Sequence, residues 1–162
     1  METICFYEEF LVPVPRDRLF RAAVIDGDNL TPKLLPHVFK SMDTIDGDGG
    51  PGTIKRTVFN EESGLRTGDQ LYRIDVLDSE NFIYRITLIE GSSLFERVES
   101  VVYEVTYADL GNNNCVVRVA TEYHPKRGLT LKEEDIMARK TTTIGFYKIM
   151  VAYLMANPDA YM

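Results

Sequence analysis

Hydrophobic and polar residues alternate through most of the chain. Aromatic and β-branched residues recur at every second position, as in strands that bury one face, and turn-rich breaks separate these runs. The pattern predicts seven strands, at residues 4–12, 38–45, 54–60, 69–77, 82–89, 94–107 and 115–123. Because short turns join the last six, we expect an antiparallel meander with one dry face. In the fifth strand this face holds Tyr84, Ile86 and Leu88.

Two short helices are predicted between the first and second strands. Proline at a first helical position predicts a helix over residues 15–24, which the Asp-Gly-Asp-Asn run at 26–29 breaks. A second helix is expected to restart at Thr31-Pro32 and to end before Pro36.

A single long helix is predicted at the end of the chain, over residues 131–156. The Asn157-Pro158 pair stops it, and acidic residues fall in its first turns, as the helix dipole prefers. At about 1.5 Å per residue the helix would be close to 40 Å long. The expected fold class is α+β, with a curved antiparallel sheet wrapped on this helix.

A glycine-rich loop, residues 46–53, precedes the third strand. Its glycines allow backbone angles that are closed to other residues, and Pro51 fixes one φ angle, so the loop should be tight. They are Gly47, Gly49, Gly50 and Gly52. Successive N–H groups in such a loop can form an anion-binding nest. However, the Gly-Lys-Ser/Thr ending of nucleotide hydrolases is absent and a strand follows, so a structural hairpin turn is favoured.

Composition indicates one globular domain over residues 1–162. The chain is 44% hydrophobic and 27% charged, and its net charge of −7 works against binding to nucleic acid or an anionic bilayer. Cys5 and Cys115 are far apart and in no metal-ligand spacing, which predicts free buried thiols and no metal site. No export signal or run of eighteen apolar residues is present, so we expect a cytoplasmic protein.

A curved sheet closed by one helix raises the question of a cavity. This chain has no Trp to fill the space between them. A ligand pocket and an ordinary packed core are both compatible with the alternation.

Five short motifs occur in the order seen in one family of plant proteins. They lie at residues 26–30, 47–55, 88–91, 122–126 and 159–161. The chain closely resembles, over its whole length, the pathogenesis-related class-ten proteins, the family of the major birch-pollen allergen. The resemblance implies the helix-grip fold, in which seven strands, two short helices and a long C-terminal helix enclose a large hydrophobic cavity. It also implies a monomeric carrier, without cofactor or membrane contact, of amphipathic plant metabolites or hormones such as flavonoids, cytokinins, sterols and fatty acids, acting in the defence response.

The resemblance also implies which residues bind the ligand. Carried over by position, they are Val24, Ile25, Asn29, Lys55, Phe59, Tyr84, Ile86, Val98, Val102, Val117, Val119, Thr142, Phe146, Ile149 and Met150. The apolar members would bury the ligand, while Asn29, Lys55 and Tyr84 would orient it. Ala23 and Thr31 stand where aromatic residues are usual in the allergen, and the polar entrance loop at 61–67 is longer.

Two enzymatic functions and one regulatory function remain as alternatives. The ribonuclease set attributed to the family would use Lys55, Glu96 and Tyr153, but Val151 replaces the helix acid, so the carboxylate pair for acid–base work is missing. Condensing enzymes of this fold need a titratable pocket residue, and Arg118 falls on the outward set. The abscisic-acid receptors are an analogy at the level of the fold alone. We therefore assign no catalytic residue.

Overall fold

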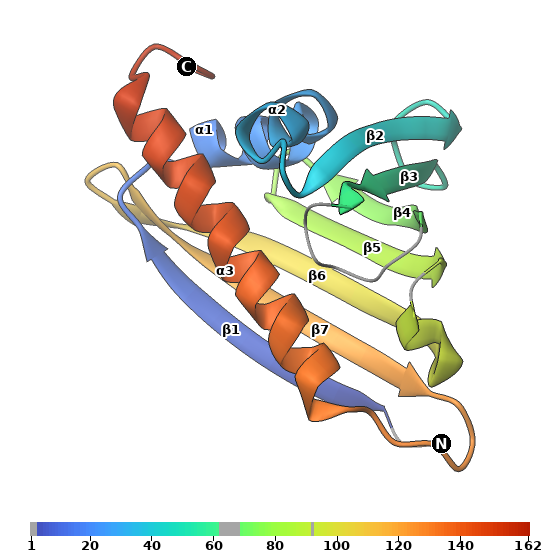
Figure 1. The fold of residues 1–162 in the computed structure, drawn as a ribbon. Coiled ribbons are helices and arrows are strands. Elements are labelled where there is room, and N and C mark those ends of the chain that lie inside the picture. The colour runs from blue at the N-terminus through green and yellow to red at the C-terminus, as the bar shows by residue number, and fades with distance from the viewer. Residues whose placement is uncertain (1–2, 62–68, 92) are drawn as a thin grey trace.

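Seven strands form one antiparallel sheet in the computed structural model, which describes residues 3–61, 69–91 and 93–162 (Figure 1). The strands are β1 (Ile4–Val12), β2 (Phe39–Asp46), β3 (Ile54–Phe59), β4 (Gln70–Asp78), β5 (Ile83–Glu90), β6 (Val98–Gly111) and β7 (Asn114–Pro125). Their order in the sheet is β1-β7-β6-β5-β4-β3-β2. The predicted meander is thus confirmed, with β1 returning to pair with the last strand.

The sheet curves around the long helix α3, Glu133–Ala156, which crosses its concave side (Figure 1). Shifts of register occur within the β2–β3, β4–β5 and β6–β7 pairs. Such bulges bend and twist the strands that carry them, which helps a sheet to wrap around a helix. The helix-grip fold class predicted from the sequence is confirmed.

Short helices fill the connection between β1 and β2, as predicted, but their boundaries differ. They are α1 (Arg16–Phe20), the π-helical turn η1 (Arg21–Ile25) and α2 (Gly27–Leu34). The predicted restart at Thr31-Pro32 is wrong, because the Asp26 carbonyl already accepts hydrogen bonds from the N–H groups of Asn29 and Leu30. The break is therefore confined to Asp26.

The sixth strand begins later than predicted. Residues 94–97 were expected to extend, but η3 (Ser93–Glu96) forms a 3₁₀ turn there. The Arg97 N–H donates to the Leu94 carbonyl at 2.9 Å, closing the turn, and the Leu94 side chain is buried. A short apolar run is compatible with either structure, and burial of Leu94 stabilises the turn. The predicted entrance loop at 61–67 lies outside the described residues from position 62 onward.

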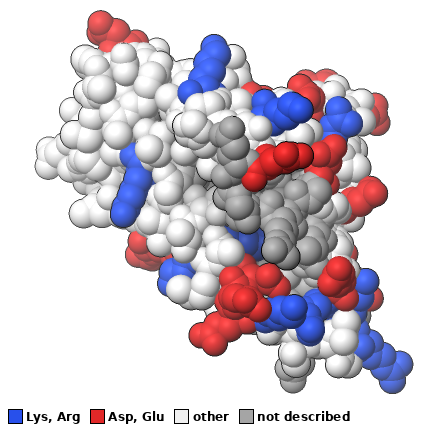
Figure 2. Space-filling view, viewed as in Figure 1, with Lys and Arg blue, Asp and Glu red and all other residues white. Residues whose placement is uncertain are grey.

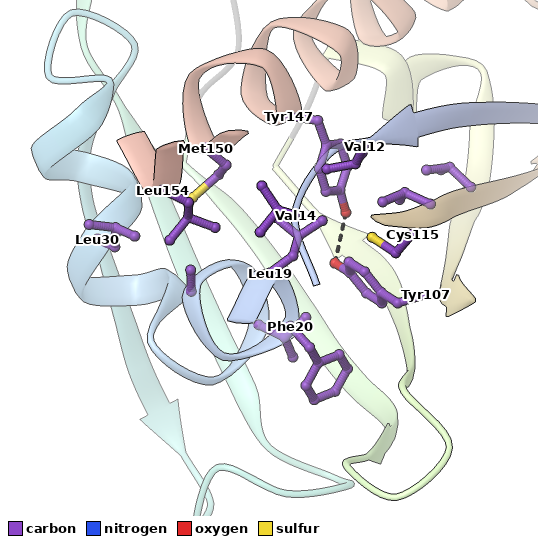
Figure 3. Close-up of a cluster of buried hydrophobic side chains, with 14 residues drawn as sticks. Val12, Val14, Leu19, Phe20, Leu30, Tyr107, Cys115, Tyr147, Met150 and Leu154 are labelled. Carbon is purple, nitrogen blue, oxygen red and sulfur yellow. Dashed lines mark hydrogen bonds between the residues drawn. The ribbon is translucent and has the colours of Figure 1, made fainter. Parts of the chain in front are cut away.

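Buried side chains form two clusters at different ends of α3. The larger, here called the packed cluster, lies where the second half of α3 meets α1, α2 and the ends of β6 and β7 (Figure 3). Its members are Val12, Val14, Leu19, Phe20, Ala22, Val24, Leu30, Tyr107, Cys115, Val117, Val119, Tyr147, Met150 and Leu154. The smaller cluster contains Tyr72, Leu88, Leu94, Val98, Val101 and Tyr123.

A buried arginine fixes the end of α3 to the packed cluster. The Arg18 guanidinium donates to the carbonyls of Leu154, Asn157 and Ala160 at 2.9–3.1 Å. Carbonyls at a helix C-terminus have no partner within the helix, and a cation there also meets the negative end of the helix dipole. Arg18 therefore caps α3 from α1.

Candidate ligand-binding site

A cavity of about 690 Å³ lies between the concave face of the sheet and α3. Of the residues predicted to bind a ligand, seven line it: Val24, Phe59, Tyr84, Ile86, Val119, Thr142 and Phe146. They come from η1, β3, β5, β7 and α3. The structure brings this half of the predicted set together around one space, and contact with a ligand stays a prediction for each.

Six apolar members of the predicted set do not line the cavity, and five of them are either exposed or packed in the clusters. Ile25 and Ile149 point outward and are 54% and 38% exposed. Val98, Val117 and Met150 are at most 1% exposed, because they pack inside the two clusters instead of facing the open space. Ile149 and Met150 were carried over by position from the family resemblance, which does not fix the rotation of α3 about its axis in this chain.

Val102 lies on the other side of the sheet. Tyr103, Val105 and Tyr107 line the cavity, so the intervening positions of β6 point away from it. Glu104 shows this directly, since it bonds at 2.9 Å to Arg85, which belongs to the outward set of β5. Val98 and Val102 are four positions apart, but the register shift between Val98 and Ser100 reverses the alternation, so Val98 packs on the inner side and Val102 faces away.

The two predicted polar members Asn29 and Lys55 do not line the cavity, and each binds an aspartate. Asn29 is exposed and donates to the Asp26 carboxylate at 3.1 Å. Lys55 Nζ lies 2.5 Å from Asp28 Oδ2, and it is Asp28 that lines the cavity. Lys55 is thus a neutralising partner of a wall carboxylate.

Three buried tyrosines, Tyr72, Tyr107 and Tyr147, and the partly buried Tyr84 contribute hydroxyl groups to the wall. Of these, only Tyr84 was predicted from the sequence. The hydroxyls of Tyr107 and Tyr147 lie 2.9 Å apart and point toward each other (Figure 3). The Tyr72 hydroxyl makes hydrogen bonds with those of Tyr84 and Thr57. Alternation along residues 69–77 places Tyr72 on the dry face, so this signal was present in the sequence.

Burial keeps these phenols neutral. It raises the pKa of Tyr107 and of Tyr147 well above the usual range, and in Tyr107 the neighbouring Tyr147 adds to the effect. Burial also raises the pKa of Tyr84, and the negative charge of Asp28 raises it further. The wall therefore offers neutral hydroxyl groups to a ligand at physiological pH.

Charged residues of both signs surround the beginning of α3 (Figure 2), whereas the face over its second half carries few charges. Four of these residues also line the cavity: Lys132, Glu134, Asp135 and Arg139. Arg139 Nη1 donates to the Tyr103 hydroxyl at 2.5 Å. With two positive and two negative side chains, this rim does not select a ligand by charge.

The glycine-rich loop uses its N–H groups within the protein. Gly49 N–H donates to Thr53 Oγ1, Gly50 N–H to Asp48 Oδ1 and Gly52 N–H to the Ile74 carbonyl, at 2.7–2.9 Å. Gly47 has a φ of +108°, and a Cβ there would lie 2.6–2.7 Å from atoms of Thr53. These contacts agree with a structural turn and leave three of the loop's N–H groups unavailable to a phosphate.

The predicted ribonuclease residues are not gathered at one site. Glu96 lies in η3 and Tyr153 in the last turn of α3, at opposite ends of the molecule (Figure 1). Lys55 is paired with Asp28, as described above. These positions do not provide a shared active site.

Cys115 is buried as predicted, but Cys5 is exposed, which corrects that part of the prediction. Within the described ranges, no group of three or more His, Cys, Asp or Glu side chains is placed to hold a metal ion. In the same ranges, no helix is long and apolar enough to cross a membrane.

Comparison with known proteins gives consistent matches over the whole chain. A sequence model of the pathogenesis-related protein Bet v 1 family matches residues 3–157. The major strawberry allergen Fra a 1-2 of Fragaria ananassa is 37% identical, and the match covers 99% of each chain. The structure of Ara h 8.0201 superposes with a TM-score of 0.87 at 31% identity, covering 96% of this chain and 100% of that one. Norcoclaurine synthase from Thalictrum flavum shares the fold, with a TM-score of 0.77 at 24% identity over 94% of this chain and 87% of the enzyme.

Proposed function

Because the chain belongs to the pathogenesis-related protein Bet v 1 family, we propose that it binds an amphipathic small molecule in the cavity beneath α3 and carries or buffers it. The cavity itself is the observation on which this proposal rests. Its volume of about 690 Å³ falls within the usual range for ligand sites, and its wall combines apolar side chains with a few hydroxyl groups.

The apolar wall supplies most of the binding free energy in this proposal. Phe59, Ile86, Val119 and Phe146 each present hydrocarbon surface to the cavity. Removing apolar surface from water contributes about 25 cal/mol per Å², so a ligand with a large hydrocarbon part gains affinity without any charge contact. The hydroxyl groups then orient it.

A plant metabolite is the proposed partner, and a single chain in the cytoplasm is the proposed working form. The similar proteins come from plants such as strawberry and apple. The net charge of −7 and the occupied N–H groups of the glycine-rich loop both disfavour a nucleic acid as partner.

Binding is favoured over catalysis. The lysine beside the wall, Lys55, forms an ion pair, and the buried tyrosines have raised pKa values, so they are poor acids near neutral pH. The likeness to norcoclaurine synthase, at 24% identity, extends to the fold.

Titration of the protein into N-phenyl-1-naphthylamine, an uncharged fluorescent probe, tests the proposal. We expect saturable binding with one site per chain and an increase in fluorescence as the probe leaves water. A second, non-fluorescent apolar compound should displace it. A linear, unsaturable signal would show that no defined cavity site exists in solution.

A further inference from the structure

The tyrosine hydroxyls carry more protons than their mutual hydrogen bonds use. We propose that this wall selects an uncharged ligand with oxygen acceptors, such as a carbonyl or ether oxygen, which accept the unused hydroxyl protons. The inference rests on the proposed function, because it specifies the chemistry of a ligand in the same cavity.

The first unused proton belongs to the Tyr107–Tyr147 pair. Each hydroxyl has one proton, and the single 2.9 Å contact between the two oxygens uses one of the two protons. This count does not depend on which hydroxyl donates. Both residues line the cavity and are at most 6% exposed, so the remaining proton is out of reach of bulk water.

The second unused proton belongs to the group formed by Thr57, Tyr72 and Tyr84. Three hydroxyls carry three protons, and the two hydrogen bonds that Tyr72 makes use two of them. All three residues line the cavity. The side-chain hydrogen-bond partner of the Tyr84 hydroxyl is Tyr72.

The two groups are neighbours on the same face of the sheet. Tyr84 lies opposite Val105 in the β5–β6 pair, and Tyr107 is two residues further along the same face. Such diagonal neighbours lie roughly 7–8 Å apart, within reach of long aromatic side chains. One ligand can therefore reach both unused protons.

Buried polar groups in native proteins almost always have hydrogen-bond partners, which here implies a ligand or water in the cavity. The partner must be an acceptor, because the groups have donors to spare. A carbonyl oxygen has two lone pairs and can accept from two donors at once. A purely hydrocarbon ligand would displace water and leave the protons unpaired.

An anionic acceptor is disfavoured at this wall. Tyr72 and Tyr84 both lie in the field of the Asp28 carboxylate, which raises the pKa of each after the larger effect of burial. Because Lys55 pairs with Asp28, this field is weakened, and the cost of desolvation is the stronger argument against an anion beside these hydroxyls. Transfer of a charged group from water into an apolar site adds a desolvation cost that an uncharged oxygen avoids.

Three probes with one naphthalene skeleton test this selection. 2-Acetylnaphthalene has a carbonyl acceptor, 2-ethylnaphthalene has the same shape without an acceptor, and 2-naphthoate is an anion at pH 7. Each is measured by displacement of N-phenyl-1-naphthylamine. We expect the ketone to bind about tenfold more tightly than the ethyl compound, from two hydrogen bonds of ordinary net strength. The naphthoate should bind more weakly than the ketone.

Substitutions of the tyrosine pair give a pattern that simple contact would not. Tyr147→Phe alone leaves the Tyr107 proton unused instead, so the preference for the ketone should persist. Tyr107→Phe/Tyr147→Phe removes both hydroxyls and should reduce the preference about threefold, as expected for one lost donor. Because both partners become apolar together, no orphaned polar group remains to destabilise the fold. Tyr7→Phe, at a residue 77% exposed on β1, is the matched control.

Each outcome distinguishes this inference from the proposed function. Equal, saturable affinities for the ketone and the ethyl compound would overturn the inference while leaving a binding cavity intact. Tighter binding of the naphthoate, or an unchanged preference in the double variant, would also overturn it. Failure of all the probes to bind would contradict the proposed function itself. The comparison of probes in the unsubstituted protein needs no variant, so the inference is testable even if the double variant fails to fold.

Discussion

The space between α3 and the sheet is filled with side chains near the end of the helix and is open near its middle. At the packed cluster, Leu19 and Leu154 are 0% exposed and Arg18 holds the end of the helix. Toward the middle of the helix, Thr142 and Phe146 instead face a cavity of about 690 Å³. One helix thus serves a solid core with its second half and a hollow site with its middle.

This difference separates stability from binding. Close packing gives each buried methylene group many contacts, so changes in the packed cluster should lower the free energy of unfolding. Residues around the cavity have fewer neighbours, and changes there should alter ligand affinity first. Tyr107 and Tyr147 lie at the boundary, because they belong to the packed cluster and also line the cavity.

The largest expected effect comes from Leu154→Ala. Removal of a fully buried leucine side chain from the packed cluster should lower the free energy of unfolding by about 3–4 kcal/mol. Urea denaturation measures this change, and affinity for N-phenyl-1-naphthylamine should stay unchanged in the folded protein. Met155→Ala, at a residue 60% exposed, is the control and should cost less than about 0.5 kcal/mol. Similar losses of unfolding free energy in both variants would show that the packed cluster is no more important for stability than the exposed face of α3.

Arg18→Gln should have the next largest effect. The substitution removes a charged donor from the carbonyls of Leu154, Asn157 and Ala160, and we expect a loss of about 2–3 kcal/mol in unfolding free energy. Arg21→Gln is the matched control, since Arg21 is 43% exposed and its guanidinium bonds the Tyr161 carbonyl. A loss for Arg21→Gln as large as that for Arg18→Gln would show that burial of Arg18 is unimportant.

Phe146→Trp should act on binding and not on stability. The larger ring crowds the cavity, so affinity for N-phenyl-1-naphthylamine should fall about tenfold, while the urea midpoint changes little. Ile149→Trp adds the same bulk to an outward position and should leave affinity unchanged. Unchanged affinity in Phe146→Trp would place the probe elsewhere.

The smallest expected effect is a dependence on pH in the packed cluster. Burial raises the pKa of Cys115 to about 11 from its ordinary value of 9.0, so the folded protein keeps a proton that the unfolded chain releases. Stability therefore falls as the pH rises from about 9 to 11. Between pH 8 and pH 10 the free energy of unfolding should fall by about 1 kcal/mol less in Cys115→Ala than in the unsubstituted protein. In Cys5→Ala, at the exposed cysteine, the free energy of unfolding should change with pH as it does in the unsubstituted protein.

Much of the fold was predictable because alternation and turn residues act locally. The order of β2 to β7 and the inward face of Tyr84, Ile86 and Leu88 follow from short connections and from a period of two. The pairing of β1 with β7 joins distant parts of the chain, which neither signal reveals. The predicted boundaries of the elements were wrong where a tertiary contact determines them, as in the turn that buries Leu94.

The site was less predictable, because a sequence shows which residues are apolar but not which of them meet an empty space. Phe146 and Met150 both belong to the apolar stripe of α3, yet one lines the cavity and the other is packed. The pairing of Tyr107 with Tyr147 joins residues 40 positions apart, which no periodicity reveals. A polar residue on a dry face, such as Tyr72, is the signal that indicates such groups.

The most direct test of the proposed site is an NMR titration of labelled methyl groups with 2-acetylnaphthalene. If the ligand binds beneath α3, the shifts should concentrate on wall methyl groups of Ile86, Val105 and Val119 and saturate at one molecule per chain. The exposed methyl groups of Leu11 and Ile25 should not respond. Shifts confined to these exposed groups, or no saturable shifts at all, would contradict a binding function for the cavity.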